Sequence, residues 1–108
     1  MAVTIWHNPR CSKSRAALAV LESRGLSPDV RLYLMDPPSA AEIADMLAAL
    51  RLPAAALLRK DGAALKALPD GAIIAAMAET PALIERPVIR VGDLAVIGRP
   101  TEAIETLL

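Results

Sequence analysis

The sequence predicts an α/β domain in which a mixed four-stranded sheet carries helices on both faces. Near the start, two β-rich apolar runs flank a helical pattern, which is the order of a right-handed βαβ unit with parallel strands. Near the end, two more β runs are joined by Gly92-Asp93, which predicts a tight antiparallel hairpin. A mostly helical stretch, 53–85, lies between these pairs. It therefore forms a helical insertion between a βαβ half and a ββα half.

The βαβ half is read from local signals. "AVTIW" (2–6) is a short β-rich run, and the turn residues of "HNPR" end it. A helical pattern begins at Ser12 and reaches its stop signal at Gly25. "DVRLYL" (29–34) then alternates apolar and polar residues, which predicts the second strand.

A well-marked helix is predicted in "DPPSAAEIADMLAAL" (36–50), between the second strand and the stretch 53–85. Ser39 and Glu42 form a capping-box pattern at its start. A third helix is predicted in "PAAALLRK" (53–60), where proline suits the first turn, and another in "GAIIAAMAET" (71–80). These patterns contain no internal repeat or linker.

The ββα half closes the chain with "PVIRV" (87–91), "LAVIG" (94–98) and a final helix in "TEAIETLL" (101–108). The complete order of elements is the thioredoxin or glutaredoxin layout with extra helices between its halves. Because 108 residues suffice for one ordinary domain and not for two, we expect a single domain over 1–108.

Composition excludes several function classes. Lys+Arg and Asp+Glu balance at 12 each, so no global charge attracts nucleic acid or a membrane surface. No apolar run approaches the ~20 residues that cross a bilayer, and no signal-peptide pattern opens the chain. A single cysteine cannot form an internal disulfide, which favours a reducing, cytoplasmic location.

The nine residues "HNPRCSKSR" (7–15) hold the only histidine and the only cysteine. Cys11 falls between a predicted strand end and a predicted helix start, where free N–H groups favour an anion. Such a position lowers a thiol pKa below its free value of ~8.5. Arg10 and Arg15 add positive charge, Ser14 offers a hydroxyl, and His7 is placed to donate to the sulfur. These features predict a nucleophilic thiol.

Cys11 and His7 also have possible structural roles that involve no chemistry. The alternative role for Cys11 is that of a small buried hydrophobe, and its Arg, Ser and Lys neighbours argue against that role. A lone histidine at a strand end, such as His7, is more often structural. "CSKS" lacks a second cysteine that would resolve a disulfide, and Ala17 stands where a tyrosine-phosphatase loop needs arginine. One histidine and one cysteine cannot complete a zinc site, so no metal is expected.

"HNPRCSKSR" closely resembles the active-site stretch of the glutaredoxin-linked, ArsC-type arsenate reductase family. "LLRK" around Arg59, "ERPVI" around Arg86 and "GRP" around Arg99 match that family in order and spacing. The likeness runs from about Thr4 to Leu107, nearly the whole chain, and implies the thioredoxin-like fold.

The resemblance implies that Cys11 attacks arsenate and forms a covalent adduct, with His7 influencing the thiol. Arg59, Arg86 and Arg99 would bind the oxyanion. Glutathione, as co-substrate, would attack the adduct, and glutaredoxin would remove the mixed disulfide and release arsenite; no bound cofactor is implied. The resemblance also suggests a cis peptide bond before Pro87.

Charge and geometry make these roles coherent. Arsenate is anionic near neutral pH, and the arginine fork matches tetrahedral oxyanions while staying charged. Arg59 also has a structural explanation, as a cation at the end of a predicted helix. Arg99 precedes the last predicted helix, where a cation opposes the dipole, so a bound anion explains it better.

Two other functions remain open at this point. A glutathione-dependent monothiol oxidoreductase of the glutaredoxin type would need Cys11 but not all three arginines. A non-enzymatic, Spx-like module that binds RNA polymerase would share the fold, but most such regulators use a Cys-x-x-Cys switch that Ser14 removes here.

Overall fold

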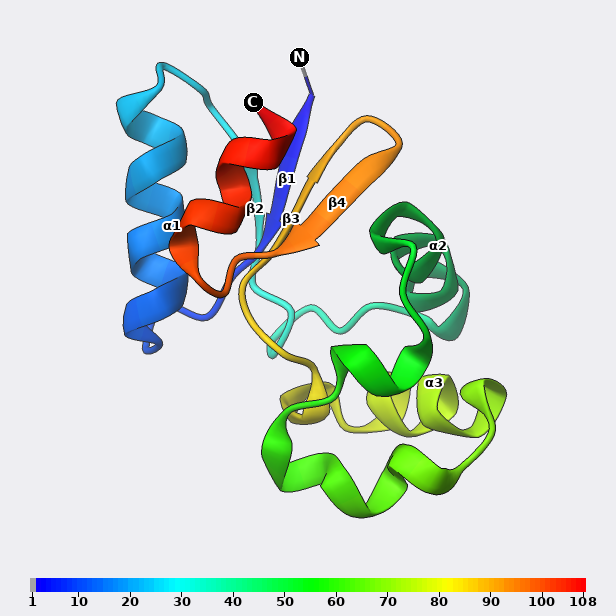
Figure 1. Ribbon diagram of the computed structural model, residues 1–108. Coiled ribbons are helices and arrows are strands. Elements are labelled where there is room, and N and C mark those ends of the chain that lie inside the picture. The colour runs from blue at the N-terminus through cyan, green and yellow to red at the C-terminus, as the bar shows by residue number, and fades with distance from the viewer. Residues whose placement is uncertain (1) are drawn as a thin grey trace.

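The computed structural model describes residues 2–108 and is built on one mixed sheet with the strand order β2–β1–β3–β4 (Figure 1). The strands are β1 (Val3–Trp6), β2 (Asp29–Arg31), β3 (Val88–Val91) and β4 (Leu94–Ile97). β1 pairs in parallel with β2 and antiparallel with β3, and β3 pairs antiparallel with β4. The predicted α/β architecture, with its parallel pair and its hairpin, is confirmed.

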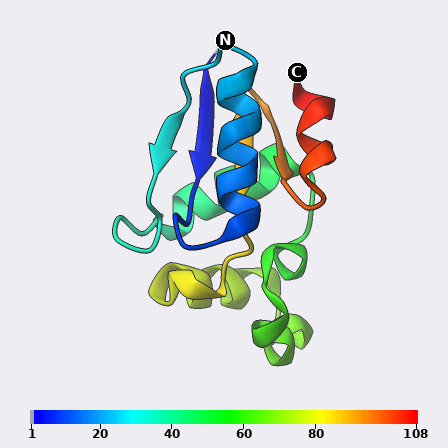
Figure 2. The same ribbon diagram turned by 90° about the vertical axis from the view of Figure 1, so that its left-hand side faces the viewer.

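Helices cover both faces of the sheet, as Figure 2 makes clear from the side of α1. Helix α1 (Ser12–Ser23) and the 3₁₀ helix η4 (Thr101–Leu107) lie on one face. Helix α2 (Ala40–Leu50) packs against β4 on the other face, and α3 (Asp70–Glu79) packs against α2 further from the sheet. None of the helices within residues 2–108 combines the length and apolar character needed to cross a membrane.

The strands separate two cores because side chains alternate between the faces of a sheet. Ile5 and Ile89 face α1 and pack with Ala17, Leu21 and Ile104. Trp6, Val88 and Ala95 belong to the other core, which is filled mainly by aliphatic side chains from α2 and α3. The stretch 7–15 follows β1, a strand whose residues contribute to both cores.

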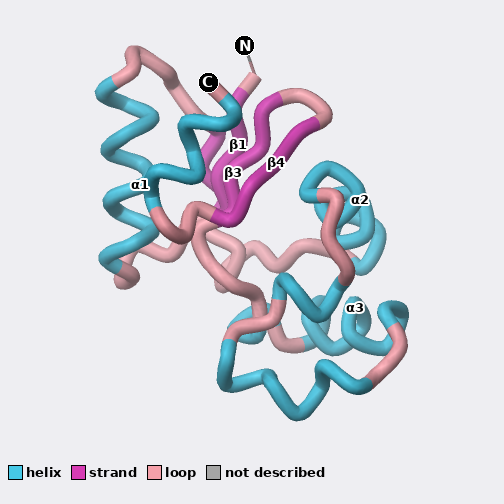
Figure 3. The backbone as a smooth tube through the Cα atoms, viewed as in Figure 1, coloured by secondary structure: helices cyan, strands magenta, loops and turns pink. Residues whose placement is uncertain are grey.

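Two predicted helices, over 53–60 and 101–108, form as 3₁₀ helices instead of α-helices, and both lie among the helical segments coloured in Figure 3. The expected helix over 53–60 is only η1 (Ala54–Leu57), after which the chain extends through Leu58 and Arg59. The following segments are η2 (Lys60–Ala67) and η3 (Pro81–Leu83), and the final helix is η4. The extension at Leu58 has a tertiary cause, because this residue forms a β-bridge with Ile84.

The second strand is shorter than the predicted 29–34, since β2 ends at Arg31. Met35 and Asp36 both donate backbone hydrogen bonds to the carbonyl of Leu32, which closes a turn there. The Arg31 guanidinium donates to the carbonyls of Asp36 and Pro37 and holds this turn against the sheet. Hydrogen bonds within residues 31–37 therefore end the strand earlier than the alternating pattern predicts.

Glycine and the capping box mark element ends as predicted. Gly25 after α1 and Gly92 in the β3–β4 hairpin both have positive φ, at +75° and +60°, which residues with a side chain rarely adopt. At the start of α2, the Ser39 hydroxyl accepts from the Glu42 N–H, and the Glu42 carboxylate accepts from the Ser39 N–H. Both halves of the capping box are present.

Replacing Ser39 with alanine is expected to lower the free energy of unfolding by about 1 kcal/mol, because loss of the capping hydroxyl leaves the Glu42 N–H of α2 unpaired. Urea denaturation monitored by circular dichroism measures the change. Ser27→Ala, in a loop, is the matched control and is expected to stay within about 0.5 kcal/mol of the parent. Equal effects of the two substitutions would show that the capping box contributes nothing to stability.

Candidate functional site

Cys11 is the N-cap residue of α1, with extended backbone at φ −94° and ψ 123°. The first turn of a helix has N–H groups without intrahelical partners, and they carry partial positive charge. The Cys11 sulfur faces this turn, and the residue is 8% exposed. The strand-to-turn-to-helix placement predicted from the sequence is therefore what the structure has, and a thiolate here is stabilised by the backbone.

The environment lowers the pKa of the Cys11 thiol below its ordinary value. Burial by itself raises this pKa. It is outweighed by the nearby backbone N–H groups of Ser14 and Lys13 at the start of α1, and by the positive charge of Arg86. Arg99 adds a contact of its own, since its Nη2 lies 3.5 Å from Cys11 Sγ. The site thus favours the nucleophilic, ionised form of sulfur.

Short-range hydrogen bonds brace the loop before Cys11. The carbonyl of Asn8 accepts from the Cys11 N–H, and the side chain of Asn8 accepts from the Arg10 N–H. The Arg15 guanidinium donates to the carbonyl of Pro9 at 2.9 Å. Arg15 therefore shapes the loop that carries the cysteine instead of pairing with the sulfur.

His7 bonds to Ser14, where the sequence suggested a hydrogen bond to the cysteine sulfur. Its Nδ1 lies 2.6 Å from Ser14 Oγ, and both residues are buried. The same hydroxyl accepts from the Asn8 N–H at 3.0 Å, so Ser14 links the histidine ring to the backbone of the loop. Burial, with the nearby charge of Arg15, lowers the pKa of His7. A neutral histidine is thus built into the support of the loop.

Three arginines predicted from separate motifs meet in one cavity of about 370 Å³, lined by Arg59, Lys60, Glu85, Arg86 and Arg99. A water molecule occupies about 30 Å³ of liquid, so the cavity has room for a tetrahedral oxyanion and part of a second reactant. Four cations against one carboxylate give it a strong preference for anions. The contact between Arg99 and Cys11 connects this cavity to the sulfur.

Backbone pairing brings Arg59 to the other two arginines. Arg59 donates its N–H to Leu83 and Leu57 accepts from Glu85, on either side of the Leu58–Ile84 bridge. Arg59 is the N-cap of η2 in extended backbone, so the sequence-based placement at the end of a helix was wrong. A cation at a helix start opposes the helix dipole, which leaves anion binding as the better explanation of its position.

Two prolines follow the other arginines, and both the Arg86–Pro87 and the Arg99–Pro100 peptide bonds are cis. The first agrees with the resemblance, and the second was not predicted. Gly98 lies against this region so closely that a Cβ there would come within 2.9 Å of Pro87 Cγ. A side chain at position 98 would thus require the side chains of Pro87 and Ile89 to shift.

Sequence reasoning missed three residues of the site. Lys60 and Glu85 are the immediate neighbours of Arg59 and Arg86, and this adjacency was the one available signal. Tyr33 was expected in the second strand, but it lies beyond the end of β2, and it is 1% exposed. Burial raises the pKa of Tyr33, and the charges of Arg86 and Arg59 act against this rise. Tyr33 therefore lies within electrostatic reach of the cavity.

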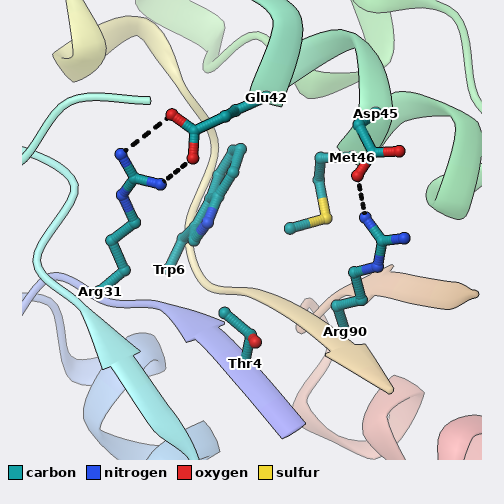
Figure 4. Close-up of a pocket in the computed structure, with 7 residues that line it drawn as sticks. All are labelled: Thr4, Trp6, Arg31, Glu42, Asp45, Met46 and Arg90. Atoms are coloured by element: carbon teal, nitrogen blue, oxygen red, sulfur yellow. Dashed lines mark hydrogen bonds and ion pairs between the residues drawn. The ribbon is translucent and has the colours of Figure 1, made fainter. Parts of the chain in front are cut away.

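A second cavity, of about 310 Å³ between α2 and the sheet, has a different character (Figure 4). Its two arginines are already paired, Arg31 with Glu42 and Arg90 with Asp45. Arg31 holds the pKa of Glu42 at about 2, well below its usual value. Paired guanidiniums of this kind fasten α2 to the sheet, whereas the cavity beside Cys11 has more cations than carboxylates.

Comparison with known proteins gives a consistent result. The model of the ArsC family matches residues 6–107. An arsenate reductase of Neisseria meningitidis is 41% identical over 114 aligned residues, covering 98% of this chain and 97% of that protein. An arsenate reductase of Haemophilus influenzae is 37% identical, with full coverage of both. The solved arsenate reductase of Vibrio cholerae superposes with a TM-score of 0.93 at 41% identity, covering 100% of this chain and 98% of the other.

Proposed function

Since this chain belongs to the ArsC family, we propose that it reduces arsenate to arsenite at Cys11, with external thiols as the reductant. One observation supports this most strongly. A cysteine sulfur at the start of a helix lies 3.5 Å from Arg99, beside a cavity lined by three arginines and a lysine. Relatives named arsenate reductase over nearly the full chain support the choice of substrate.

In the first step, the Cys11 thiolate attacks arsenic and forms a sulfur–arsenic bond. An arsenic–oxygen bond breaks, and the departing oxygen takes a proton and leaves as water. Arg59, Arg86 and Arg99 neutralise the oxyanion so that two negative groups can approach each other. Arginine suits this task because it stays charged and presents a planar fork to the oxygens.

In the second step, a glutathione thiolate attacks the Cys11 sulfur. The sulfur–arsenic electron pair stays with arsenic, so arsenic(V) becomes arsenic(III) and two thiols become one mixed disulfide. Since Cys11 is the only cysteine, the electrons that restore it must come from outside the chain. Glutaredoxin is proposed to remove the glutathione and regenerate the thiol.

His7 and Ser14 have a supporting role in this proposal. Their hydrogen bond, together with that from Asn8 to the same hydroxyl, fixes the loop that presents the sulfur. Because His7 has a lowered pKa, it is neutral near pH 7 and adds no charge to the site. Pro87 and Arg15 contribute by position, one beside Gly98 and the other through the carbonyl of Pro9.

The test is arsenate-dependent oxidation of NADPH in the presence of glutathione, glutaredoxin and glutathione reductase. We expect turnover that needs arsenate and glutathione, and competitive inhibition by phosphate, which has the same shape but is not reduced. Turnover of a glutathionylated peptide without any arsenate reduction would instead identify a monothiol oxidoreductase. Absence of both activities would overturn the proposal.

A further inference from the structure

Glu85 is an unexpected residue in a cavity that favours anions. Its carboxylate is 23% exposed and lies among Arg59, Lys60, Arg86 and Arg99. A negative charge at this place repels an incoming oxyanion, which costs binding energy unless the carboxylate serves another purpose. The contacts of Glu85 indicate what that purpose is.

The same carboxylate oxygen contacts both arginines that precede the cis prolines. Glu85 Oε1 lies 3.6 Å from Arg86 Nη1 and 3.5 Å from Arg99 Nε, and it accepts the Arg86 backbone N–H at 3.1 Å. The backbone of Glu85 is itself fixed, because its N–H donates to Leu57 at 2.7 Å. Glu85 therefore connects two chain segments from a rigid position.

The two guanidiniums depend on this contact to different degrees. Arg99 Nε also donates to the Arg86 carbonyl at 2.7 Å, and this leaves Nη2 directed at Cys11. The Nε of Arg86 is buried and has no hydrogen-bond partner within residues 2–108. Without a carboxylate between them, two neighbouring guanidiniums would repel each other and separate.

We propose that Glu85 is a positioning residue that holds the guanidiniums of Arg86 and Arg99 together and toward Cys11. The inference extends the oxyanion site of the proposed function, on which it rests. The charge of Glu85 also matters for anion binding. Three arginines and one lysine outweigh Glu85, the Cys11 thiolate and Asp61, which lies 3.8 Å from Arg59 Nε, so the site keeps a net positive charge. Glu85 thus reduces the positive charge of the cavity without removing its preference for an oxyanion.

A positioning role and a purely electrostatic role of Glu85 predict opposite changes in the Cys11 pKa and in anion affinity when the carboxylate is removed. If Glu85 acted only as a nearby negative charge, Glu85→Ala would make the cavity more positive. The pKa of Cys11 would then fall and anions would bind more tightly. If Glu85 holds the arginines, they move away from the sulfur. The pKa of Cys11 then rises and anion binding weakens, even though net positive charge increases.

The groups that face Cys11 come from several segments. The start of α1 supplies the N–H groups of Lys13 and Ser14, and Arg86 and Arg99 supply positive charge. Among these contributions, only those of Arg86 and Arg99 depend on contacts with Glu85. A rise in the pKa of Cys11 in the variant therefore reports on the guanidiniums and not on the helix.

The experiment measures the rate of Cys11 alkylation by iodoacetamide against pH, with and without inorganic phosphate. In Glu85→Ala we expect a raised Cys11 pKa and a roughly 10–100-fold weaker protection by phosphate, the range found for groups that orient the ligands of a site. Glu85→Gln keeps the shape and the acceptor for the Arg86 N–H, so its phosphate protection is expected to fall between the parent and Glu85→Ala.

Asp45→Asn is the matched control, because it removes a carboxylate paired with an arginine at 2.7 Å in the other cavity. It is expected to leave both readouts unchanged. In Glu85→Ala, a lowered Cys11 pKa with tighter phosphate protection, or no change in either quantity, would overturn the positioning role. If Glu85→Ala does not fold, weaker protection in Glu85→Gln supports the role and unchanged or tighter protection overturns it. Arsenate turnover is not used, so failure of the proposed reaction leaves this result interpretable.

Discussion

Replacement of Cys11 with serine is expected to abolish arsenate-dependent turnover, with a loss of at least about 10⁴-fold in kcat/KM, as for other nucleophiles that act as part of a unit. Serine has nearly the same size, so the N-cap position and the cavity are retained. Its hydroxyl stays protonated near neutral pH, however, and an oxygen cannot carry the mixed disulfide. The chain contains no second cysteine that would substitute.

The coupled assay with NADPH, glutathione and glutaredoxin measures this loss. Ser23→Ala is a suitable control, because Ser23 lies at the other end of α1 and its hydroxyl donates only to the Val20 carbonyl. The control is expected to retain parental activity. If Cys11→Ser kept a tenth of the parental rate, the reaction would not pass through this sulfur.

Replacement of Arg99 with alanine is expected to lower kcat/KM by roughly 10²–10³-fold, the cost of removing one preorganised donor from such a site. Arg99 is chosen because its Nη2 is the guanidinium nitrogen that lies 3.5 Å from Cys11 Sγ. Arg99→Lys should recover only part of the loss. Lysine keeps the charge, but it has no planar fork with which to contact the sulfur and the oxyanion together.

The comparison variant is Arg24→Ala, which removes an arginine paired with Glu105 on the surface. An exposed ion pair contributes at most about 1 kcal/mol to stability, so this variant should turn over normally. Equal rates for Arg99→Ala and the parent would show that the arginine contacts the sulfur without taking part in the reaction.

Elements with local signals were predicted well from the sequence. The Gly92-Asp93 hairpin and the capping box at Ser39 depend on neighbouring residues alone, and both are present. The end of η1 at Leu57 depends on a distant contact, because Leu58 pairs with Ile84. The end of β2 depends on hydrogen bonds from the Arg31 side chain to the turn that follows, which an alternating pattern does not show. A residue pattern of one segment does not contain that information.

The residues of the site divide in the same way, into those with local sequence signals and those that depend on distant contacts. The position of Cys11 before a helix follows from its local sequence, whereas the convergence of three arginines was expected only through resemblance to a family. Glu85 was not predicted because its contact with Arg99 joins segments that are apart along the chain. The partner of His7 was also wrongly predicted, because Ser14 comes within reach of the ring only when the first turn of α1 has formed.

The most direct test of the account is the titration of Cys11 in the unmodified protein, followed through its alkylation rate against pH. We expect a midpoint below the ordinary thiol pKa of about 8.5. Phosphate or arsenate should raise that midpoint and slow alkylation, because a bound anion offsets the guanidinium charge and covers the sulfur. A midpoint at the ordinary value that neither oxyanion shifts would contradict the account.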